Sequence, residues 1–232
     1  MNIALVHDQL VNYGGAEGVF LTLSKMYPKA DIYTSFFDEK NPSYFSISDR
    51  IIKKISLPKS FRYSTLGKLI VNAYWQSLDL TKYDLVITSS DTFSCHSVIT
   101  GPETTHVAYI HTPPRYLYAE DPNYYEIGRT SFIRNIIISY LRNCDKIASQ
   151  RPDVIVVPSD TVKKRVLKYY RIKPLVIPCP VSTAAGIKRE RTQDAYLLLG
   201  RIETHKGVEL VVNAFARSKK KLLIAGIGKE YK

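Results

Sequence analysis

The sequence lacks paired cysteines, long apolar runs and a leader segment. Its three cysteines, Cys95, Cys144 and Cys179, are scattered, which argues against a disulfide framework and against a cysteine-rich zinc site. No run reaches the roughly 20 apolar residues that a membrane-spanning helix requires. The chain enters a strand-like run at residues 3–6 without the basic segment and cleavage site of a signal peptide. These absences indicate a cytoplasmic protein.

Several short motifs of nucleotide and metal enzymes are also missing. There is no Gly-x-x-x-x-Gly-Lys-Ser/Thr phosphate loop, and no third glycine follows Gly226-Ile227-Gly228 at the spacing of a dinucleotide-binding loop. There is no His-Glu-x-x-His motif or Cys/His cluster to bind a metal, and no Gly-x-Ser-x-Gly nucleophile elbow. We therefore expect neither a metal nor a cofactor.

Acidic residues are fewer than basic residues. The chain has 33 Lys and Arg residues against 21 Asp and Glu residues, a formal net charge of +12, which favours anionic partners such as nucleic acid, lipid headgroups or phosphorylated substrates. The basic residues are dispersed, as the pairs and triplets at 53–54, 163–165, 188–189 and 219–221 illustrate. Dispersal favours solvated surface, with a membrane-facing or phosphate-attracting face as the alternative. The 17 tyrosines form no recognisable stacking platform, so nucleic acid is not an expected partner.

What is present is an alternation of short apolar runs with helical patterns, which is typical of βαβ units around a parallel sheet. Strands are expected at residues 3–6, 32–34, 85–87, 107–110, 154–157 and 175–177, and helices at 16–27, 64–79, 131–149 and 160–170. The Ser159 hydroxyl is placed to cap the last of these helices. The sequence therefore predicts an α/β fold.

A change of composition follows residue 178. Pro178-Cys179-Pro180 interrupts regular structure, and residues 182–194 read as a linker. A second unit then opens with an expected strand at 196–199, a helix at 207–217 and a strand at 222–225. We place a domain boundary near residue 180, with one Rossmann-like domain at 1–180. Residues 181–232 hold the linker and about one βαβ repeat of a second domain, too little for a core of its own.

Two segments at expected strand ends in the first domain are candidates for binding. After the first strand come His7-Asp8 and then Gly14-Gly15 at a helix start, where glycine admits close approach and free amides favour an anion. Ligands of such sheets bind at the carboxyl ends of the strands, which favours a ligand-facing role over an ordinary turn. The segment from His111 to Tyr116 follows a later strand. His111 is placed to orient a polar substrate, or is an ordinary loop histidine, and Arg115 is placed to bind phosphate or to pair with a nearby carboxylate.

The segment 200–207 in the second domain carries the most specific signal. A strand ends at Gly200, and Arg201 and Lys206 bracket a loop that leads into a helix at Gly207. A guanidinium for bidentate contact, an ammonium point charge and a helix N-terminus suit a diphosphate group. The alternative is a solvated basic loop.

Together these segments resemble the retaining GT-B glycosyltransferases known as family 4, or group 1, over essentially the whole chain. The matching motifs occur in the family's order: His7-Asp8 with Gly14-Gly15-Ala16-Glu17, the strand Tyr83-Asp84-Leu85-Val86-Ile87-Thr88-Ser89-Ser90, His111-Thr112-Pro113 with Arg115-Tyr116, Asp145 with Arg151-Pro152-Asp153 and Ser159, and Gly200-Arg201 with Lys206-Gly207. The third motif resembles a mannosyltransferase-like subgroup.

The resemblance implies the transfer of a hexosyl group, with mannosyl as the first guess, from a nucleotide-diphosphate sugar to a glycan or lipid-linked acceptor with retention. It implies that His111 is catalytic, and that Arg201, Lys206 and Gly15 bind the donor diphosphate without a metal. Gly14, Asp8, Arg115 and Ser159 are further substrate-binding candidates. The first domain would be the acceptor side and the second the donor side. Contact with the inner membrane face fits the basic charge and a lipid-phosphate acceptor.

Alternatives remain at this stage. The family's Glu-x7-Glu element would lie beyond Lys232, so the chain is also readable as a non-catalytic fragment, or as an acceptor-binding subunit of a split enzyme whose second chain supplies the rest of the donor domain. An anion-binding protein and a sugar-nucleotide epimerase fit the sequence less well. The former rests on charge alone, and the latter lacks the match at 200–207.

Overall fold

The computed structural model of the chain describes residues 1–118, 132–181, 194–203 and 206–228. It divides into two compact units, Met1–Val181 and Ser182–Lys232, called unit 1 and unit 2 below. Each unit is described by itself. Among the described residues, no helix combines the length and apolarity needed to cross a bilayer.

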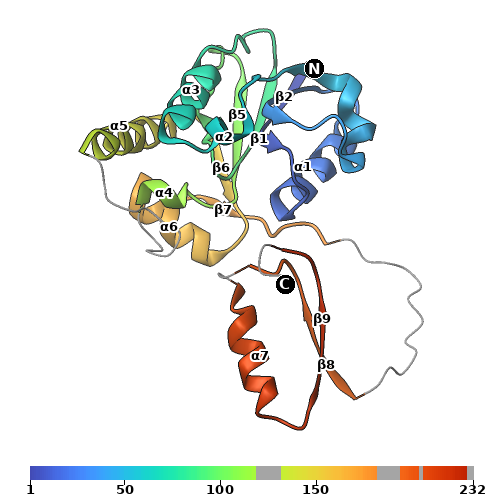
Figure 1. Cartoon of the computed structure of the whole chain (residues 1–232). Helices are drawn as coiled ribbons and strands as arrows, with labels where there is room; N and C mark the ends of the chain where they lie inside the picture. Colours follow the sequence, from blue (N-terminus) through green and yellow to red (C-terminus); the bar gives the residue numbers. More distant parts are fainter. Residues whose placement is uncertain (119–131, 182–193, 204–205, 229–232) are drawn as a thin grey trace. The chain divides into compact units, whose positions relative to one another are not determined.

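Unit 1 is built on a parallel sheet with the strand order β3-β2-β1-β4-β5-β6-β7 (Figure 1). The strands are β1 (Ile3–Leu10), β2 (Asp31–Phe37), β3 (Ile51–Lys53), β4 (Leu85–Ser90), β5 (Thr105–Ile110), β6 (Val154–Val157) and β7 (Leu175–Val176). Strands β2 and β3 extend the sheet to one side of β1, whereas the chain returns to the other side of β1 to begin β4. The carboxyl ends of β1 and β4 therefore form the topological switch point, where ligands of doubly wound sheets bind.

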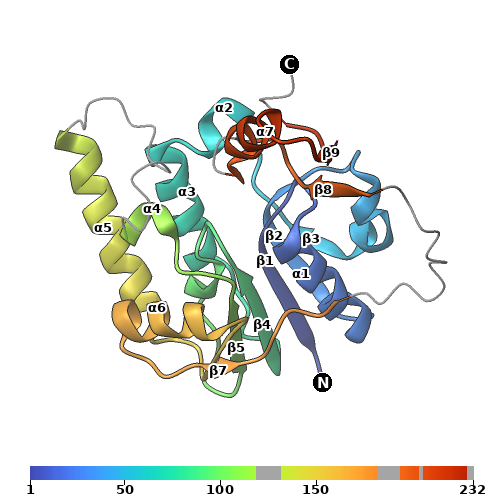
Figure 2. The same ribbon diagram turned by 90° about the horizontal axis from the view of Figure 1, so that it is seen from below.

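Helices cover both faces of this sheet (Figures 1 and 2). The 12-residue helix α1 (Gly15–Met26) and the 3-10 helix η1 (Pro42–Arg50) pack against one face, where Phe20 and Tyr44 meet the inward side chains of β1 and β2. Helices α3 (Thr65–Gln76), α5 (Phe132–Ala148) and α6 (Asp160–Tyr170) cover the other face. There, fully buried Trp75 of α3 is the largest core side chain. We call these the α1 face and the α3 face.

Side-chain alternation along the strands assigns each polar residue of the sheet to a face. In β1, Val6 packs with the core of the α3 face, whereas the ring of His7 stacks on Phe20 of the α1 face at 4.7 Å between centroids. In β4, Ser89 is level with His7 in the parallel register, and Ser90 points to the opposite side. This alternation decides which polar groups meet at the edge of the sheet.

Unit 2 contains strand β8 (Ala195–Leu199), helix α7 (Val208–Ala216) and strand β9 (Lys221–Ala225), and its two strands pair in parallel. This is one βαβ repeat. A side chain at Gly226 would place its Cβ 1.8 Å from the carbonyl oxygen of Gly200, so the close approach of the two segments beyond the strand ends requires glycine there.

The predicted α/β class is confirmed, and each predicted strand and helix coincides with an observed one. The main error in position concerns β1, which continues to Leu10 rather than ending at residue 6. Five short elements had no prediction: η1, β3, α2 (Lys59–Arg62), η2 (Cys95–Ser97) and α4 (Arg115–Tyr118). They are too short for periodicity to reveal. The predicted linker at 182–194 lies almost wholly outside the described residues.

Candidate functional site

At the carboxyl edge of the sheet, Ser89 forms hydrogen bonds with two histidines, His7 and His111. The Nδ1 atom of His7 lies 2.9 Å from the carbonyl oxygen of Ser89, and the Ser89 hydroxyl lies 2.9 Å from Nε2 of His111. A carbonyl oxygen can only accept, so His7 carries its proton on Nδ1 and keeps a lone pair on Nε2. We call His7, Ser89 and His111 the edge cluster.

Both histidines of the edge cluster are neutral near pH 7. Burial, followed by the neighbouring His111, lowers the pKa of His7 from 6.5 to about 3, and the hydrogen bond to Ser89 only partly opposes this shift. Burial lowers the pKa of His111 to about 4. Burial disfavours the charged form of an imidazole. His111 is only partly buried, so a neutral ring at this edge can exchange hydrogen bonds with a hydroxyl group of a ligand.

The two candidate glycines lie at the start of α1, at the same edge. Gly14 is the N-cap residue and has no side chain to cap the first turn, where the Glu17 carboxyl interacts with the backbone of Gly14 and Glu17. A Cβ atom at Gly15 would meet no other group within 4 Å. Packing therefore does not require glycine at position 15, and the space in front of its backbone is open to a ligand.

Three carboxyl groups surround this glycine loop. Burial raises the pKa of Glu17 to about 7, with smaller contributions from Asp91 and Asp8. Burial and Asp8 raise the pKa of Asp91 to about 6, while Arg115 acts in the opposite direction. Arg115 is exposed at the start of α4. Both acids therefore titrate close to neutral pH, a property that is common at functional sites.

Asp8, a substrate-binding candidate, has a different placement. Its side chain is 1% exposed. One carboxylate oxygen accepts from the amides of Asp91 and Phe93, each at 2.7 Å, and the other accepts from the amide of Cys95 at 2.8 Å. Asp8 thus fixes the backbone of the loop that follows β4. Because both of its carboxylate oxygens already accept hydrogen bonds from this loop, Asp8 is better suited to position the loop than to contact a ligand.

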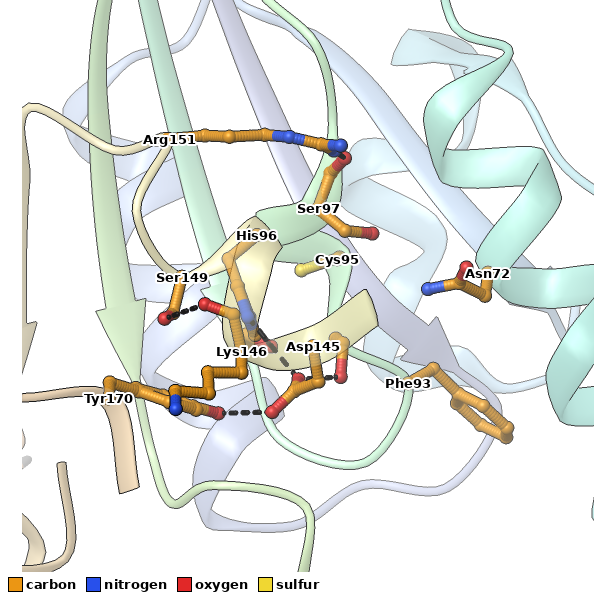
Figure 3. Close-up of polar contacts among 12 residues, drawn as sticks. Asn72, Phe93, Cys95, His96, Ser97, Asp145, Lys146, Ser149, Arg151 and Tyr170 are labelled. Carbon is orange, nitrogen blue, oxygen red and sulfur yellow. Dashed lines mark hydrogen bonds and ion pairs between the residues drawn. The ribbon is translucent and has the colours of Figure 1, made fainter. Parts of the chain in front are cut away.

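A second polar cluster lies on the α3 face, centred on the buried carboxylate of Asp145 in α5 (Figure 3). One oxygen of Asp145 accepts from Ser94 at 2.5 Å and lies 3.4 Å from Nε2 of His96. The other accepts from Tyr118 at 2.8 Å and from Tyr170 at 2.7 Å. Nδ1 of His96 in turn lies 3.0 Å from the hydroxyl of Ser90. We call Ser90, Ser94, His96, Tyr118, Asp145 and Tyr170 the buried cluster.

The buried cluster connects segments that are far apart in the chain. Burial alone would raise the pKa of Asp145, but His96 and the hydroxyl donors outweigh it, so that pKa lies below its ordinary value of 3.8. The carboxylate is therefore charged at neutral pH and fully hydrogen-bonded. Through Tyr118 it anchors the end of α4, the helix that follows the His111 loop.

Ser159 lies at the carboxyl end of β6 and caps α6, as predicted, by accepting from the amide of Val162 at 3.4 Å. Its hydroxyl is therefore engaged in stabilising the helix start. In the sheet order, one strand, β5, separates β6 from the β1–β4 switch point, and Ser159 is not a member of the edge cluster.

The remaining candidates, Arg201 and Lys206, belong to unit 2. Arg201 is exposed and pairs with Glu203 at 3.4 Å, and the amide of Lys206 donates to the carbonyl of Glu203 at 2.8 Å. Gly207 has a positive φ of 65° and caps α7 without a side-chain hydrogen bond. The loop thus presents an exposed cation before a helix start whose free amides are not bonded by the side chain of the N-cap residue, an arrangement that suits an anion. Residues 204–205 lie outside the described residues.

A hollow of about 590 Å³ exists at the opposite, amino-terminal edge of the sheet of unit 1, between the start of β1 and the end of α1. It is lined by Asn2, Tyr27, Pro28, Lys29 and Tyr83, among others. Ligand binding in doubly wound sheets takes place at the carboxyl edge, and the perturbed acids and the histidine pair all lie at that edge. We therefore assign the site to the carboxyl edge.

The sequence placed His111 after a strand and the glycine loop before a helix, as the structure does, but it did not predict the contacts that join the polar groups. One feature of the sequence could have indicated both the contact of Ser89 with the two histidines and the buried cluster around Asp145. It is the run Thr88-Ser89-Ser90 in a strand that is otherwise apolar and buried. Small hydroxyl side chains in such a strand need partners. Here each of the three bonds a different histidine, His106 for Thr88 being the third.

Comparison with known proteins gives one result that bears on this edge. A family model described as Glycosyltransferase Family 4 matches residues 13–185. The match includes the glycine loop, Ser89, His111 and Ser159, whereas Asp8, Arg201 and Lys206 lie outside it. No curated protein matches the chain. Because the family match covers most of the chain and nearly all of unit 1, this chain belongs to glycosyltransferase family 4 and has a glycosyltransferase-type function.

Proposed function

We propose that this protein transfers a hexosyl group, with mannosyl as the first candidate, from a nucleotide-diphosphate sugar to a glycan or lipid-linked acceptor with retention of configuration. The observation that carries the proposal is the edge cluster, in which His7, Ser89 and His111 hold two neutral imidazoles at the switch point beside the open backbone of Gly15. Neutral imidazoles and open amides suit a polyhydroxylated, phosphate-bearing ligand.

In this proposal, unit 1 holds the reacting sugar and the acceptor. The neutral ring of His111 exchanges a hydrogen bond with a sugar hydroxyl and orients the ring over the edge of the sheet. The backbone at Gly15 approaches the donor phosphates, and the N-terminus of α1 favours their negative charge. Arg115, at the start of the following helix, is placed to contact an anionic acceptor and to tune the acid at Asp91.

Arg201 and Lys206 bind the donor diphosphate in the proposed reaction. The acceptor hydroxyl oxygen bonds to the anomeric carbon as the bond from that carbon to the diphosphate oxygen breaks, and the hydroxyl proton passes to the departing phosphate. The two cations offset the charge that develops on the leaving group, so the proposed transfer requires no metal. Preorganised charges of this kind often supply a large share of catalysis.

A transfer assay tests the proposal. The full chain is incubated with a panel of GDP- and UDP-sugars and with glycan and lipid-phosphate acceptors, and both nucleoside diphosphate release and the glycosylated product are measured. One donor, GDP-mannose in the first instance, should support transfer. Arg201→Ala should weaken donor binding by about 10- to 100-fold, because a charged hydrogen bond to phosphate is lost.

Arg217→Ala is the matched control, since Arg217 is an exposed arginine of the same unit that follows α7. It should leave donor binding unchanged. Absence of turnover with every donor, together with unchanged donor binding in Arg201→Ala, would contradict the proposal.

A further inference from the structure

The outer side of α5 exposes an apolar stripe in which Asn143 is the one polar position. Phe132, Ile133, Ile136, Tyr140 and Ile147 are between 53% and 78% exposed. At 3.6 residues per turn, these five positions fall within an arc of about 100° on one side of the helix. We call these five side chains the α5 stripe.

Unit 1 does not need the α5 stripe for its own packing. The opposite side of α5 supplies the buried residues Leu141, Asp145 and Ala148, and Ile137 and Ile138 pack against α3 and α4. Thus α5 is apolar on two sides, of which only one faces the core. Five exposed apolar side chains gathered on one side of a helix, rather than scattered singly, indicate an interaction site.

Among the described residues of α2, α3 and α5, the exposed charge is of one sign. Helices α2, α3 and α5 together carry six basic residues, Lys59, Arg62, Lys68, Arg134, Arg142 and Lys146. Their one acidic residue is Asp145, which is 1% exposed and turned into the buried cluster. On α5 itself, exposed Arg142 and Lys146 flank the stripe on one side. Near Arg134, burial and the charge of that arginine lower the pKa of Lys68 to about 8.

The α5 stripe and the basic residues beside it together favour one kind of binding partner. A symmetric dimer would cover the α5 stripe, but it would offer Arg142 and Lys146 no anionic partner, because the exposed charges of α5 are all positive. Nucleic acid would satisfy the charges but not five side chains of which three are isoleucines. An anionic bilayer satisfies both, because aliphatic and aromatic side chains enter the boundary of headgroups and acyl chains while Lys and Arg remain with the anionic headgroups.

We propose that α5 is a membrane-surface helix through which unit 1 binds the surface of an anionic bilayer, with the α5 stripe inserted and Arg142 and Lys146 at headgroup level. The helix lies in the plane of the surface and does not cross the bilayer. Its 17 residues give a contact about 25 Å long. This surface is separate from the edge cluster and does not depend on the proposed transfer reaction.

Vesicle co-sedimentation of the full chain, without donor or acceptor, tests this inference. The protein should bind vesicles of phosphatidylcholine mixed with phosphatidylglycerol and should bind vesicles of phosphatidylcholine alone more weakly, and added salt should reduce the difference. The double variant Ile136→Gln/Ile147→Gln should bind the anionic vesicles at least about tenfold more weakly, because two inserted aliphatic side chains are lost.

Two matched controls separate α5 from general properties of the chain. Phe45→Gln removes a 59% exposed aromatic side chain from η1, on the opposite face of the sheet, and should leave vesicle binding unchanged. Lys146→Gln should weaken binding to anionic vesicles severalfold, whereas Lys25→Gln on α1 should not. Because glutamine is a good helix former, the circular dichroism of the α5 variants should match that of the wild type.

Two outcomes would overturn the inference. One is binding to anionic vesicles that the α5 double variant retains in full. The other is a dimer, detected by light scattering without lipid, that the same variant dissociates, since the α5 stripe would then be an interface between copies. Both readouts are independent of turnover, so failure of the membrane surface and failure of the transfer reaction are distinguishable.

Discussion

Ser89 and Ser90 are neighbours in β4, yet they belong to polar clusters on opposite faces of the sheet. Ser89 joins His111, and its carbonyl accepts from His7 on the α1 face. Ser90 bonds His96, which lies against Asp145 on the α3 face. Both clusters combine a serine of the same strand with imidazole rings at the carboxyl edge of the sheet. They differ in whether a charged carboxylate lies against the imidazole ring.

That difference separates the candidate binding site from a cluster that holds the fold together. In the buried cluster, the charged Asp145 takes up three hydroxyl donors and both of its oxygens are engaged. In the edge cluster no carboxylate bonds either histidine, burial keeps both rings neutral, and His111 remains partly exposed. The first arrangement holds segments together. The second leaves hydrogen-bonding capacity for a ligand.

The largest expected effect is on stability, from the centre of the buried cluster. Asp145→Ala should lower the free energy of unfolding by about 3–5 kcal/mol, because it removes a buried charge on which a histidine and three hydroxyl groups converge. Urea unfolding measures this. Asp49→Ala, at an exposed position of η1, should change it by less than about 0.5 kcal/mol. A small effect of Asp145→Ala would remove the distinction between the clusters.

The next effect is on activity, from the edge cluster. His111→Ala should lower kcat/KM for sugar transfer by about 100-fold, since in the proposed reaction its ring hydrogen-bonds the reacting sugar. The same variant should unfold at nearly the wild-type urea concentration, because the ring is only partly buried. Wild-type transfer rates in His111→Ala would show that the edge cluster is not the reacting site.

Acid should affect the two clusters in different pH ranges. The unfolded chain protonates His7 near 6.5, whereas the folded protein does so near 3. Between these values the unfolded state binds more protons, so stability falls as the pH falls, by up to about 1.4 kcal/mol per pH unit. The pKa of Asp145 is lowered, so its contribution persists until the pH falls below its ordinary 3.8.

Unfolding free energies measured across this acid range should therefore decline less steeply for His7→Gln than for the wild type. Asp145→Asn should leave the slope between pH 6.5 and 3.8 unchanged. Parallel curves for the wild type and His7→Gln would mean that His7 is not held neutral by burial.

Much of the fold followed from the sequence because periodicity is a local signal. Helices α1, α3, α5 and α6 each repeat apolar residues over three turns or more, and β4, β5 and β6 contain the apolar runs 85–87, 107–110 and 154–157. Strand β1 was predicted too short, because His7 and Asp8 look like the start of a loop. The structure instead stacks His7 on Phe20 and binds Asp8 to three amides, contacts that depend on distant residues.

The site was predictable only in part for the same reason. The position of His111 after a strand and of Gly14-Gly15 before a helix pointed to the carboxyl edge. In the sequence, His7 and Ser89 are more than 80 residues apart, and Ser89 and His111 are more than 20 residues apart. The raised pKa of Glu17 arises from burial and from Asp91 and Asp8. Neither property has a signature in a local window of sequence.

The most direct test of the contrast is one pair of substitutions, Ser89→Ala and Ser90→Ala, each measured for both kcat/KM and urea unfolding. Ser89→Ala should lower kcat/KM by about five- to tenfold, with the free energy of unfolding nearly unchanged, because it releases His111 at a partly exposed edge. Ser90→Ala should lower the free energy of unfolding by about 1–2 kcal/mol, with kcat/KM nearly unchanged, because it leaves a buried nitrogen of His96 unpaired. The account is contradicted if the two variants behave alike, or if activity falls in Ser90→Ala and stability in Ser89→Ala.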